Sequence, residues 1–204
     1  MPVEESKIVL LFKEIQYGNK AAFDELFASY YDKLLSFAKQ YVKLESAEEI
    51  VSELFVRLWL KKDRLANVLR PEVYLYICVK NACLNLIRSD QKRGRLFATE
   101  NAEYEVDQVA SVGGLEDKEL EKLLGTAVAA LPAQRRLVFK LIKEQGLKSN
   151  AVAQILGISV RTVENQLYKA LKTLADAISS YLGYHPQAKI QRKQVVSKLS
   201  SIFF

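Results

Sequence analysis

Apolar side chains recur at intervals of three and four residues along most of this 204-residue chain. The clearest run comprises Phe23, Leu26, Phe27, Tyr30, Leu34 and Phe37. Because an α-helix turns once in 3.6 residues, this spacing gathers the run on one helical face. Alternating β-branched runs bounded by turn residues, which would predict strands, are missing. The sequence therefore predicts an all-α fold.

Proline marks a helix start in the first half of the chain. Pro71 suits the first turn of a helix, and the helix beginning there would carry Val73, Ile77 and Leu84 inward. We expect this helical unit to end near Ser89.

The helical spacing fades after Asp90 and resumes at Leu115, after a glycine pair. Leu131–Pro132 predicts the start of another helix, which should end at Gly146. The pattern predicts two small helical domains joined by a flexible linker, the second containing a helix-turn-helix. The expected limits are 1–89 for the first domain, 90–114 for the linker, 115–183 for the second domain and 184–204 for a C-terminal tail.

Charge is distributed unevenly along the chain. Residues 1–89 hold 13 basic and 12 acidic side chains, residues 90–130 hold 5 and 9, and residues 131–204 hold 12 and 3. The net charge of the last part is therefore +9, which favours a polyanionic partner through phosphate contacts. A solvated basic surface that only keeps the protein soluble is the alternative.

Other classes of protein are poorly supported by the composition. Cys78 and Cys83 lie five residues apart in an expected helix, so we interpret both as buried thiols of a reducing compartment. His185 is the only histidine, so we expect no metal site and no cofactor. Residues 1–16 lack the pattern of a signal peptide, and no apolar run reaches the roughly 18 residues of a membrane span. We expect a cytoplasmic protein without stable membrane insertion.

Residues 150–174 carry the most informative pattern. A short apolar face on one helix ends at Gly157, which can adopt the positive φ of a tight turn. Ser159 suits the N-cap of a second helix, and small Ala153 lets the two helices approach closely. The inward face of the second helix consists of Val160, Val163, Leu167, Leu171 and Leu174. Together these features predict a helix-turn-helix.

Placing Val163 inward turns a polar face outward. Arginine can bind guanine and asparagine can bind adenine through paired hydrogen bonds, while lysine suits phosphates. An ordinary solvated helix face is the alternative. The residues predicted to contact duplex DNA are Arg161, Thr162, Glu164, Asn165, Tyr168, Lys169 and Lys172.

The chain resembles the extracytoplasmic-function sigma factors of the sigma-70 family over about residues 20–90 and 115–176. In the first stretch, residues 22–31 and 47–59 are similar to the region 2 helices of that family. In the second, residues 131–136 and 152–167 are similar to region 4. The resemblance implies a non-enzymatic factor that binds core RNA polymerase, recognises promoter DNA and supports promoter melting.

By this resemblance, the helix over residues 47–59 docks on the largest polymerase subunit. The matching positions are Glu49, Ser52, Glu53 and Arg57, and Ser52 departs from the glutamine usual in the family. A charged outer face could equally be only solvated.

The resemblance also implies that residues after Pro71 bind the melted promoter strand. Stacking on rings offsets part of the cost of unstacking bases, at about 1–3 kcal/mol per base. The predicted contacts are Tyr74, Tyr76, Asn81, Asn85 and Arg88. The alternative is that the tyrosines belong to the core and the asparagines are only solvated.

Several expectations concern partners. The resemblance implies an anti-sigma factor and no small-molecule substrate. The tail over 184–204 has the pattern of a basic amphipathic helix, and a frayed end is its other interpretation. A helix-turn-helix activator that is not a polymerase subunit remains the alternative function. A metal-dependent nuclease is disfavoured, because Glu48, Glu49 and Glu53 cannot all point into one cleft from one helix.

Overall fold

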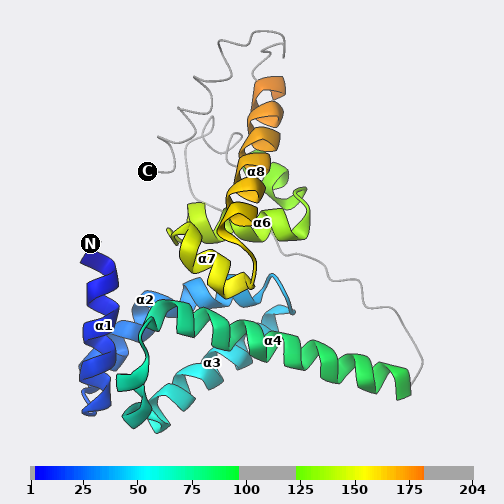
Figure 1. The fold of residues 1–204 in the computed structure, drawn as a ribbon. Helices are drawn as coiled ribbons and strands as arrows, with labels where there is room; N and C mark the ends of the chain where they lie inside the picture. Colours follow the sequence, from blue (N-terminus) through cyan, green and yellow to red (C-terminus); the bar gives the residue numbers. More distant parts are fainter. Residues whose placement is uncertain (1–2, 97–122, 182–204) are drawn as a thin grey trace. The chain divides into compact units, whose positions relative to one another are not determined.

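The computed structural model describes residues 3–96 and 123–181 (Figure 1). The chain divides into two compact units, Met1–Val106 and Asp107–Phe204. All secondary structure in the described residues is helical, which confirms the predicted all-α fold. The linker from residue 97 onward and the tail from residue 182 lie outside the described residues.

Over residues 3–96, the first unit contains four α-helices and one 3₁₀ helix. They are α1 (Val3–Gln16), α2 (Lys20–Ala38), α3 (Leu44–Leu60), η1 (Lys62–Asn67) and α4 (Pro71–Leu96). The predicted start at Pro71 is confirmed. None of the helices in either described range is long and apolar enough to cross a membrane.

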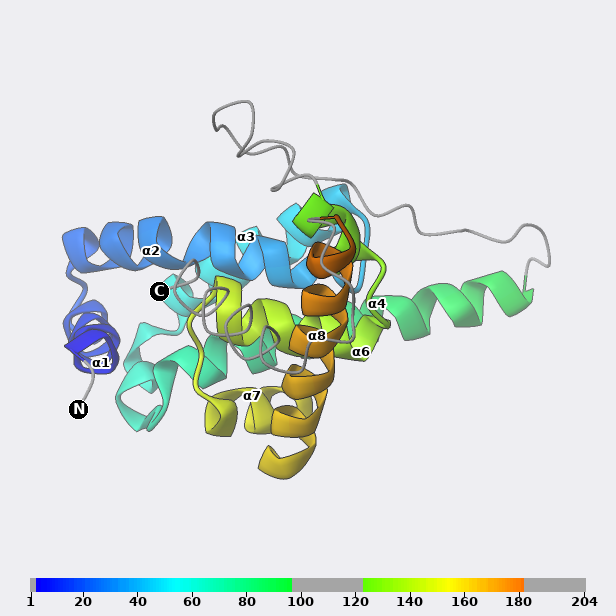
Figure 2. The ribbon, with the colours of Figure 1, turned by 90° about the horizontal axis from the view of Figure 1, so that it is seen from above.

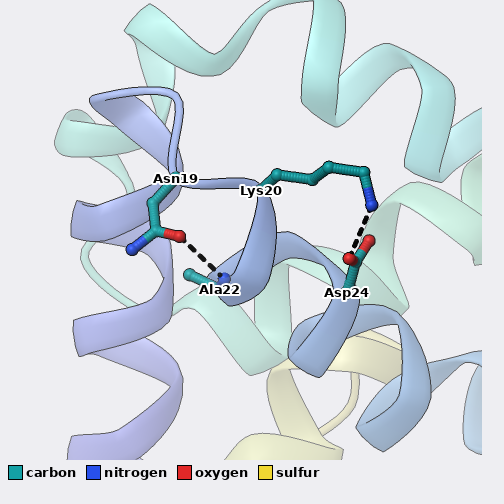
Figure 3. A network of polar contacts seen from close by, with 4 residues as sticks. All are labelled: Asn19, Lys20, Ala22 and Asp24. Atoms are coloured by element: carbon teal, nitrogen blue, oxygen red, sulfur yellow. Dashed lines mark hydrogen bonds and ion pairs between the residues drawn. The ribbon is translucent and has the colours of Figure 1, made fainter.

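The turn between α1 and α2 shows how the local sequence sets a helix start. Gly18 adopts φ +83°, which turns the chain. The side-chain oxygen of Asn19 then accepts a hydrogen bond of 3.2 Å from the backbone N–H of Ala22, as an N-cap residue does (Figure 3). Lys20 directly follows Asn19, and its amine lies 2.7 Å from a carboxylate oxygen of Asp24, one turn further along α2.

The core of the first unit receives one face from each helix. Leu26 and Leu34 of α2, Val51 of α3 and Leu75 and Val79 of α4 are fully buried. Of the three residues predicted to point inward from α4, Val73 is buried, and Ile77 and Leu84 are half-buried. Since α4 packs against α1, α2 and α3, its buried face is broad and is centred near Val79.

Helix α4 continues past the expected end near Ser89 to Leu96. In both views its C-terminal half extends beyond the other helices of the first unit (Figures 1 and 2). An exposed half-helix needs no apolar stripe, and Gln91 and Lys92 have high helix propensity. The fading of apolar spacing therefore marked the end of the core and not the end of the helix.

Between residues 123 and 181, the second unit contains a helical segment over residues 123–129 and four further elements. These are α6 (Ala133–Phe139), a π-helical turn η2 (Lys140–Glu144), α7 (Ser149–Leu156) and α8 (Val160–Tyr181). The Leu131–Pro132 boundary is confirmed, because α6 begins directly after it. The run ends at Glu144, and Gly146 comes two residues later with φ +73°, close to the predicted end.

Two apolar clusters hold the long helix α8 in place. The larger cluster joins Val128, Leu131, Phe139, Ala170 and Leu174, and the smaller one joins Ala175 and Ile178 to partly buried leucines of residues 123–124. Helix α8 is thereby fixed along its length, and its first turns are free to carry a polar outer face.

Candidate nucleic-acid and protein interfaces

The turn between α7 and α8 has the geometry that the sequence predicts. Gly157 adopts φ +72°, and its N–H and that of Ile158 both donate to the carbonyl of Ala153, at 2.9 and 3.0 Å. A Cβ built on Gly157 would meet no atom within 4 Å. Glycine is therefore favoured at this turn because it tolerates the positive φ, and not because a side chain would lack space.

Ser159 is the N-cap of α8. Its Oγ accepts a hydrogen bond of 3.1 Å from the backbone N–H of Thr162 and lies 2.8 Å from the Thr162 hydroxyl. Behind the turn, Val152, Ile155 and Val163 are fully buried. The cap and this apolar contact fix the direction of α8 as it leaves the turn.

The outer face of the first turns of α8 gathers most of the residues predicted to contact duplex DNA. Tyr168 is 69% exposed. Thr162 is half-buried and its hydroxyl contacts Ser159, so it serves the cap. We call the exposed remainder the reading face: Arg161, Glu164, Asn165, Tyr168, Lys169 and Lys172.

The outer side of α3 presents the four predicted polymerase-binding residues, all exposed: Glu49, Ser52, Glu53 and Arg57. Arg57 donates a hydrogen bond of 3.0 Å from Nε to Glu53, and a second guanidinium nitrogen lies 2.6 Å from the same carboxylate oxygen. The hydrogen bond to Glu53 raises the pKa of Arg57 above its ordinary value. The pair therefore holds two opposite charges in a fixed arrangement at the surface.

Sequence reasoning missed two apolar residues on the same side of α3. Val56 is 56% exposed and Leu60 is 71% exposed. The signal was present, because residues four apart on a helix lie on one face, and both come after Ser52 at that spacing. We define the α3 face as Glu45, Glu49, Ser52, Glu53, Val56, Arg57 and Leu60, all of them exposed.

Helix α4 presents four of its five predicted contacts on one side. Tyr74, Asn81, Asn85 and Arg88 succeed each other at intervals of seven, four and three residues and are all exposed. A guanidinium nitrogen of Arg88 donates a hydrogen bond of 3.3 Å to the side-chain oxygen of Asn85. We call these four residues the α4 face.

The fifth predicted contact, Tyr76, is a correction. Its side chain is 0% exposed, and its ring packs edge-on against Phe37 with centroids 5.2 Å apart. Two residues on a helix are about 200° apart, so Tyr74 and Tyr76 cannot share a face. The buried hydroxyl of Tyr76 has no hydrogen-bond partner among the described residues, and burial raises its pKa well above the ordinary value.

Cys78 links the α3 and α4 faces. The thiol is half-buried, hydrogen-bonded with Tyr74, and close enough to Arg57 to interact with its charge. Burial raises the pKa of Cys78, while Tyr74 and Arg57 oppose that rise. Cys83 is buried as predicted, with its pKa raised to about 11 by burial, whereas the prediction that Cys78 is also buried is wrong in part, because Cys78 is only half-buried. Cys78 thus lies near one residue of each face, Arg57 of the α3 face and Tyr74 of the α4 face.

A helix-turn-helix with an exposed polar recognition helix defines a DNA-binding protein of the helix-turn-helix class. Two family models match the chain: Sigma-70 region 2 over residues 26–93 and Sigma-70 region 4 over residues 121–174. The chain belongs to the sigma-70 family and is a non-enzymatic sigma factor of the extracytoplasmic-function group, acting in transcription initiation. An activator outside that family would leave the region 2 match unexplained.

Curated relatives support this assignment. The chain is 22% identical to the ECF RNA polymerase sigma-E factor of Haemophilus influenzae over 176 residues, covering 82% of this chain and 93% of the relative. It is 21% identical to the sigma-E factor of Escherichia coli over 179 residues, covering 83% and 93%.

Two solved structures share the fold. CnrH, in complex with the cytosolic domain of CnrY, superposes with a TM-score of 0.54 at 19% identity and covers 85% of this chain and 98% of CnrH. The sigma factor RpoE of Bartonella quintana, in complex with the anti-sigma factor NepR, gives 0.52 at 20% identity and covers 77% and 96%.

Proposed function

We propose that this sigma factor divides promoter recognition among three surfaces. The α3 face binds core RNA polymerase, the α4 face binds the melted promoter strand, and the reading face of α8 binds an upstream duplex element. The proposal depends most on the reading face. Gly157 and Ser159 fix the turn before α8, and α8 then presents Arg161 and Asn165 on its exposed side.

The chemistry of the reading face suits the major groove. Arg161 can bind the two acceptors of guanine, and Asn165, one turn later, can bind the acceptor and donor of adenine. Lys169 and Lys172 lie further toward the C-terminal part of α8 and suit backbone phosphates. Base contacts near the start of the helix and phosphate contacts further along are the usual arrangement of a recognition helix.

The α4 face suits single-stranded DNA. Tyr74 offers an exposed ring for stacking, Asn81 and Asn85 offer amide donors and acceptors, and Arg88 adds a positive charge. Stacking of one base on an aromatic ring contributes about 1–3 kcal/mol, which offsets part of the cost of opening the duplex.

The α3 face suits a protein partner. Its exposed Val56 and Leu60 form an apolar patch at the C-terminal end of α3, and Glu49, Glu53 and Arg57 place charges beside and before it. Protein interfaces usually combine apolar contacts with charged groups at their margin. Ser52, where the family usually has glutamine, offers a shorter side chain and fewer hydrogen bonds to that partner.

The remaining assignments depend on this role. We place the protein in the cytoplasm with core polymerase and promoter DNA as partners, and we expect an anti-sigma factor to regulate it. The proposed functional limits are 1–89 for the region 2 domain and 115–183 for the region 4 domain, with the linker over 90–114 between them and the tail over 184–204 after them.

Reconstituted transcription tests the proposal. The purified chain should bind core polymerase and direct it to one promoter class from a random template pool. Glu53→Lys should weaken core binding because it breaks the Arg57 pair and reverses a charge, whereas Asp90→Lys, the same charge change on α4, should not. Unchanged core affinity of Glu53→Lys would refute the docking face.

Promoter opening tests the α4 face separately. Asn81→Ala should slow opening, measured by the fluorescence of a base analogue in the melted element, more than it weakens initial binding. If the opening rate is unaltered, Asn81 does not contact the melted strand.

A further inference from the structure

We propose that Glu164 of the reading face selects a cytosine in the upstream duplex by accepting a hydrogen bond from the exocyclic amino group of that base. The inference rests on the proposed function of the reading face. Glu164 differs from its neighbours there because it is acidic on a surface that should bind a polyanion. It is the only acidic side chain between Glu144 and Asp176. The same stretch holds four basic side chains, which are Lys148, Arg161, Lys169 and Lys172.

The carboxylate of Glu164 is exposed and makes no contact that would neutralise it. Within residues 3–96 and 123–181, it takes part in no hydrogen bond and no ion pair. The exposed carboxylates of Asp24 and Glu53, by contrast, are each paired with a basic side chain. An unpaired carboxylate is repelled by DNA phosphates. Its presence on the reading face therefore weakens DNA binding unless the carboxylate meets a hydrogen-bond donor of the DNA.

Glu164 lies in the part of α8 that can enter a groove. Ser159 caps the helix, and Glu164 follows in the second turn. Residues three and four apart are neighbours on a helix surface, so Glu164 lies between Arg161 and the exposed Tyr168. Three residues correspond to about 4.5 Å along the helix axis, which is close to the rise of about 3.4 Å per base pair. Glu164 therefore comes within about one base pair of the contact proposed for Arg161.

The chemistry of a carboxylate favours one base in the major groove. A glutamate carboxylate accepts hydrogen bonds and cannot donate them. Guanine presents two acceptors in the major groove, adenine presents an acceptor beside its amino group, and thymine presents an acceptor and a methyl group. Cytosine presents its amino group without an acceptor. Glu164 is therefore attracted by cytosine and repelled by the acceptors of the other three bases, which gives selectivity through both contact and exclusion.

Permuted duplexes test this selection. The full chain, reconstituted with core RNA polymerase, selects a preferred upstream element from random duplexes, and each position of that element is then changed to the other three bases. Replacing one cytosine should weaken binding of the wild type by roughly 5- to 150-fold, the range of a good base contact. Glu164→Ala should bind all four bases at that position nearly equally. It should also bind unrelated DNA more tightly, because the repulsion from phosphates is removed.

Two matched variants separate base selection from charge. Asp176→Ala makes the same charge change at another exposed position of α8, about 18 Å further along the helix, and should leave every base preference unchanged. Glu164→Gln places a donor and an acceptor where the carboxylate was, and this combination matches adenine. The preference at that position should therefore shift from cytosine toward adenine. Identical preferences in wild type, Glu164→Ala and Glu164→Gln overturn the proposal.

A modified base tests the hydrogen bond itself. A pyrimidinone nucleotide is cytosine without its exocyclic amino group. At the selected position, this nucleotide should weaken binding of the wild type about as much as a base change does. Glu164→Ala should not respond to the replacement, because the acceptor of the amino group is already missing. Equal sensitivity of wild type and Glu164→Ala overturns the proposal, since the loss would then come from weaker base pairing.

The outcomes distinguish this inference from the proposed function. If Arg161→Ala changes the preference at one position and Glu164→Ala changes it at none, the reading face stands and selection by Glu164 is wrong. If Glu164→Ala alters only the guanine preference that Arg161→Ala also removes, Glu164 orients Arg161 and the cytosine contact is wrong. If the wild type shows no base preference at any position, both the reading face and this inference are overturned.

Discussion

Helices α8 and α4 both present polar faces to solvent, yet only one of those faces was fully predictable. In α8, the turn residues before the helix and one apolar side determine which residues point outward, and the exposed set matches the prediction apart from the capping Thr162. In α4, packing against three neighbouring helices buries a broad sector, and Tyr76 lies inside it while Tyr74 does not. The exposed residues of a helix that packs on one side can be predicted from its apolar spacing. The exposed residues of a helix that packs on several sides are harder to predict in this way.

The largest expected effect is a difference in the free energy of unfolding between substitutions at Tyr76 and at Tyr74. Tyr76→Ala should lower the free energy of unfolding of the first unit by about 3–5 kcal/mol, because it leaves a large cavity beside Phe37. Tyr74→Ala should cost about 1 kcal/mol or less, since that ring is exposed. Denaturant unfolding followed through Trp59 measures both, and equal losses would contradict the assignment of Tyr76 to the core.

The next effect concerns base recognition by α8. Arg161→Ala should weaken binding to the preferred duplex by about 1–3 kcal/mol and relax specificity at one base position. Lys172→Ala should weaken binding to all sequences nearly equally and reduce the salt dependence. Binding to duplexes permuted at each position distinguishes the two, and a uniform loss for Arg161→Ala would rule out base readout.

A smaller effect tests the turn that aligns α8. Gly157→Ala should destabilise the second unit by about 1–2 kcal/mol, because a side chain disfavours φ +72° even where space is free. Gly125→Ala is the matched control, since Gly125 lies in a helix with open space around it and should gain up to about 1 kcal/mol. Thermal unfolding of both variants measures the two changes in stability. If both substitutions change the stability in the same direction, the explanation is contradicted.

The smallest effect concerns the N-cap. Ser159→Ala should cost about 1 kcal/mol by removing the acceptor of the Thr162 N–H, and Ser159→Asp should retain most of the stability because aspartate also caps helices. The free energy of unfolding checks this order. An aspartate variant as weak as the alanine variant would mean that the cap contributes little here.

The sequence predicted features that depend on neighbouring residues along the chain. The αL glycine, the capping serine and the start at Pro71 are set by local backbone chemistry, and each is confirmed. The exposure of Val56 and Leu60, the burial of Tyr76 and the extension of α4 to Leu96 depend on which helices pack where. Apolar spacing alone does not record how many neighbours a helix has, so these features needed the tertiary structure.

A widened turn follows α6 and leads the chain toward α7. The N–H of Gln145 donates to Lys140, five residues back, at 3.1 Å, so this turn holds one residue more than an α-helical turn. Each residue added to or removed from a helix rotates the downstream chain by about 100°. A one-residue deletion here would therefore turn α7 and α8 relative to α6 and break the apolar packing of Phe139 on Ala170 and Leu174, so the widened turn and the shared core of α6 and α8 have to match one another.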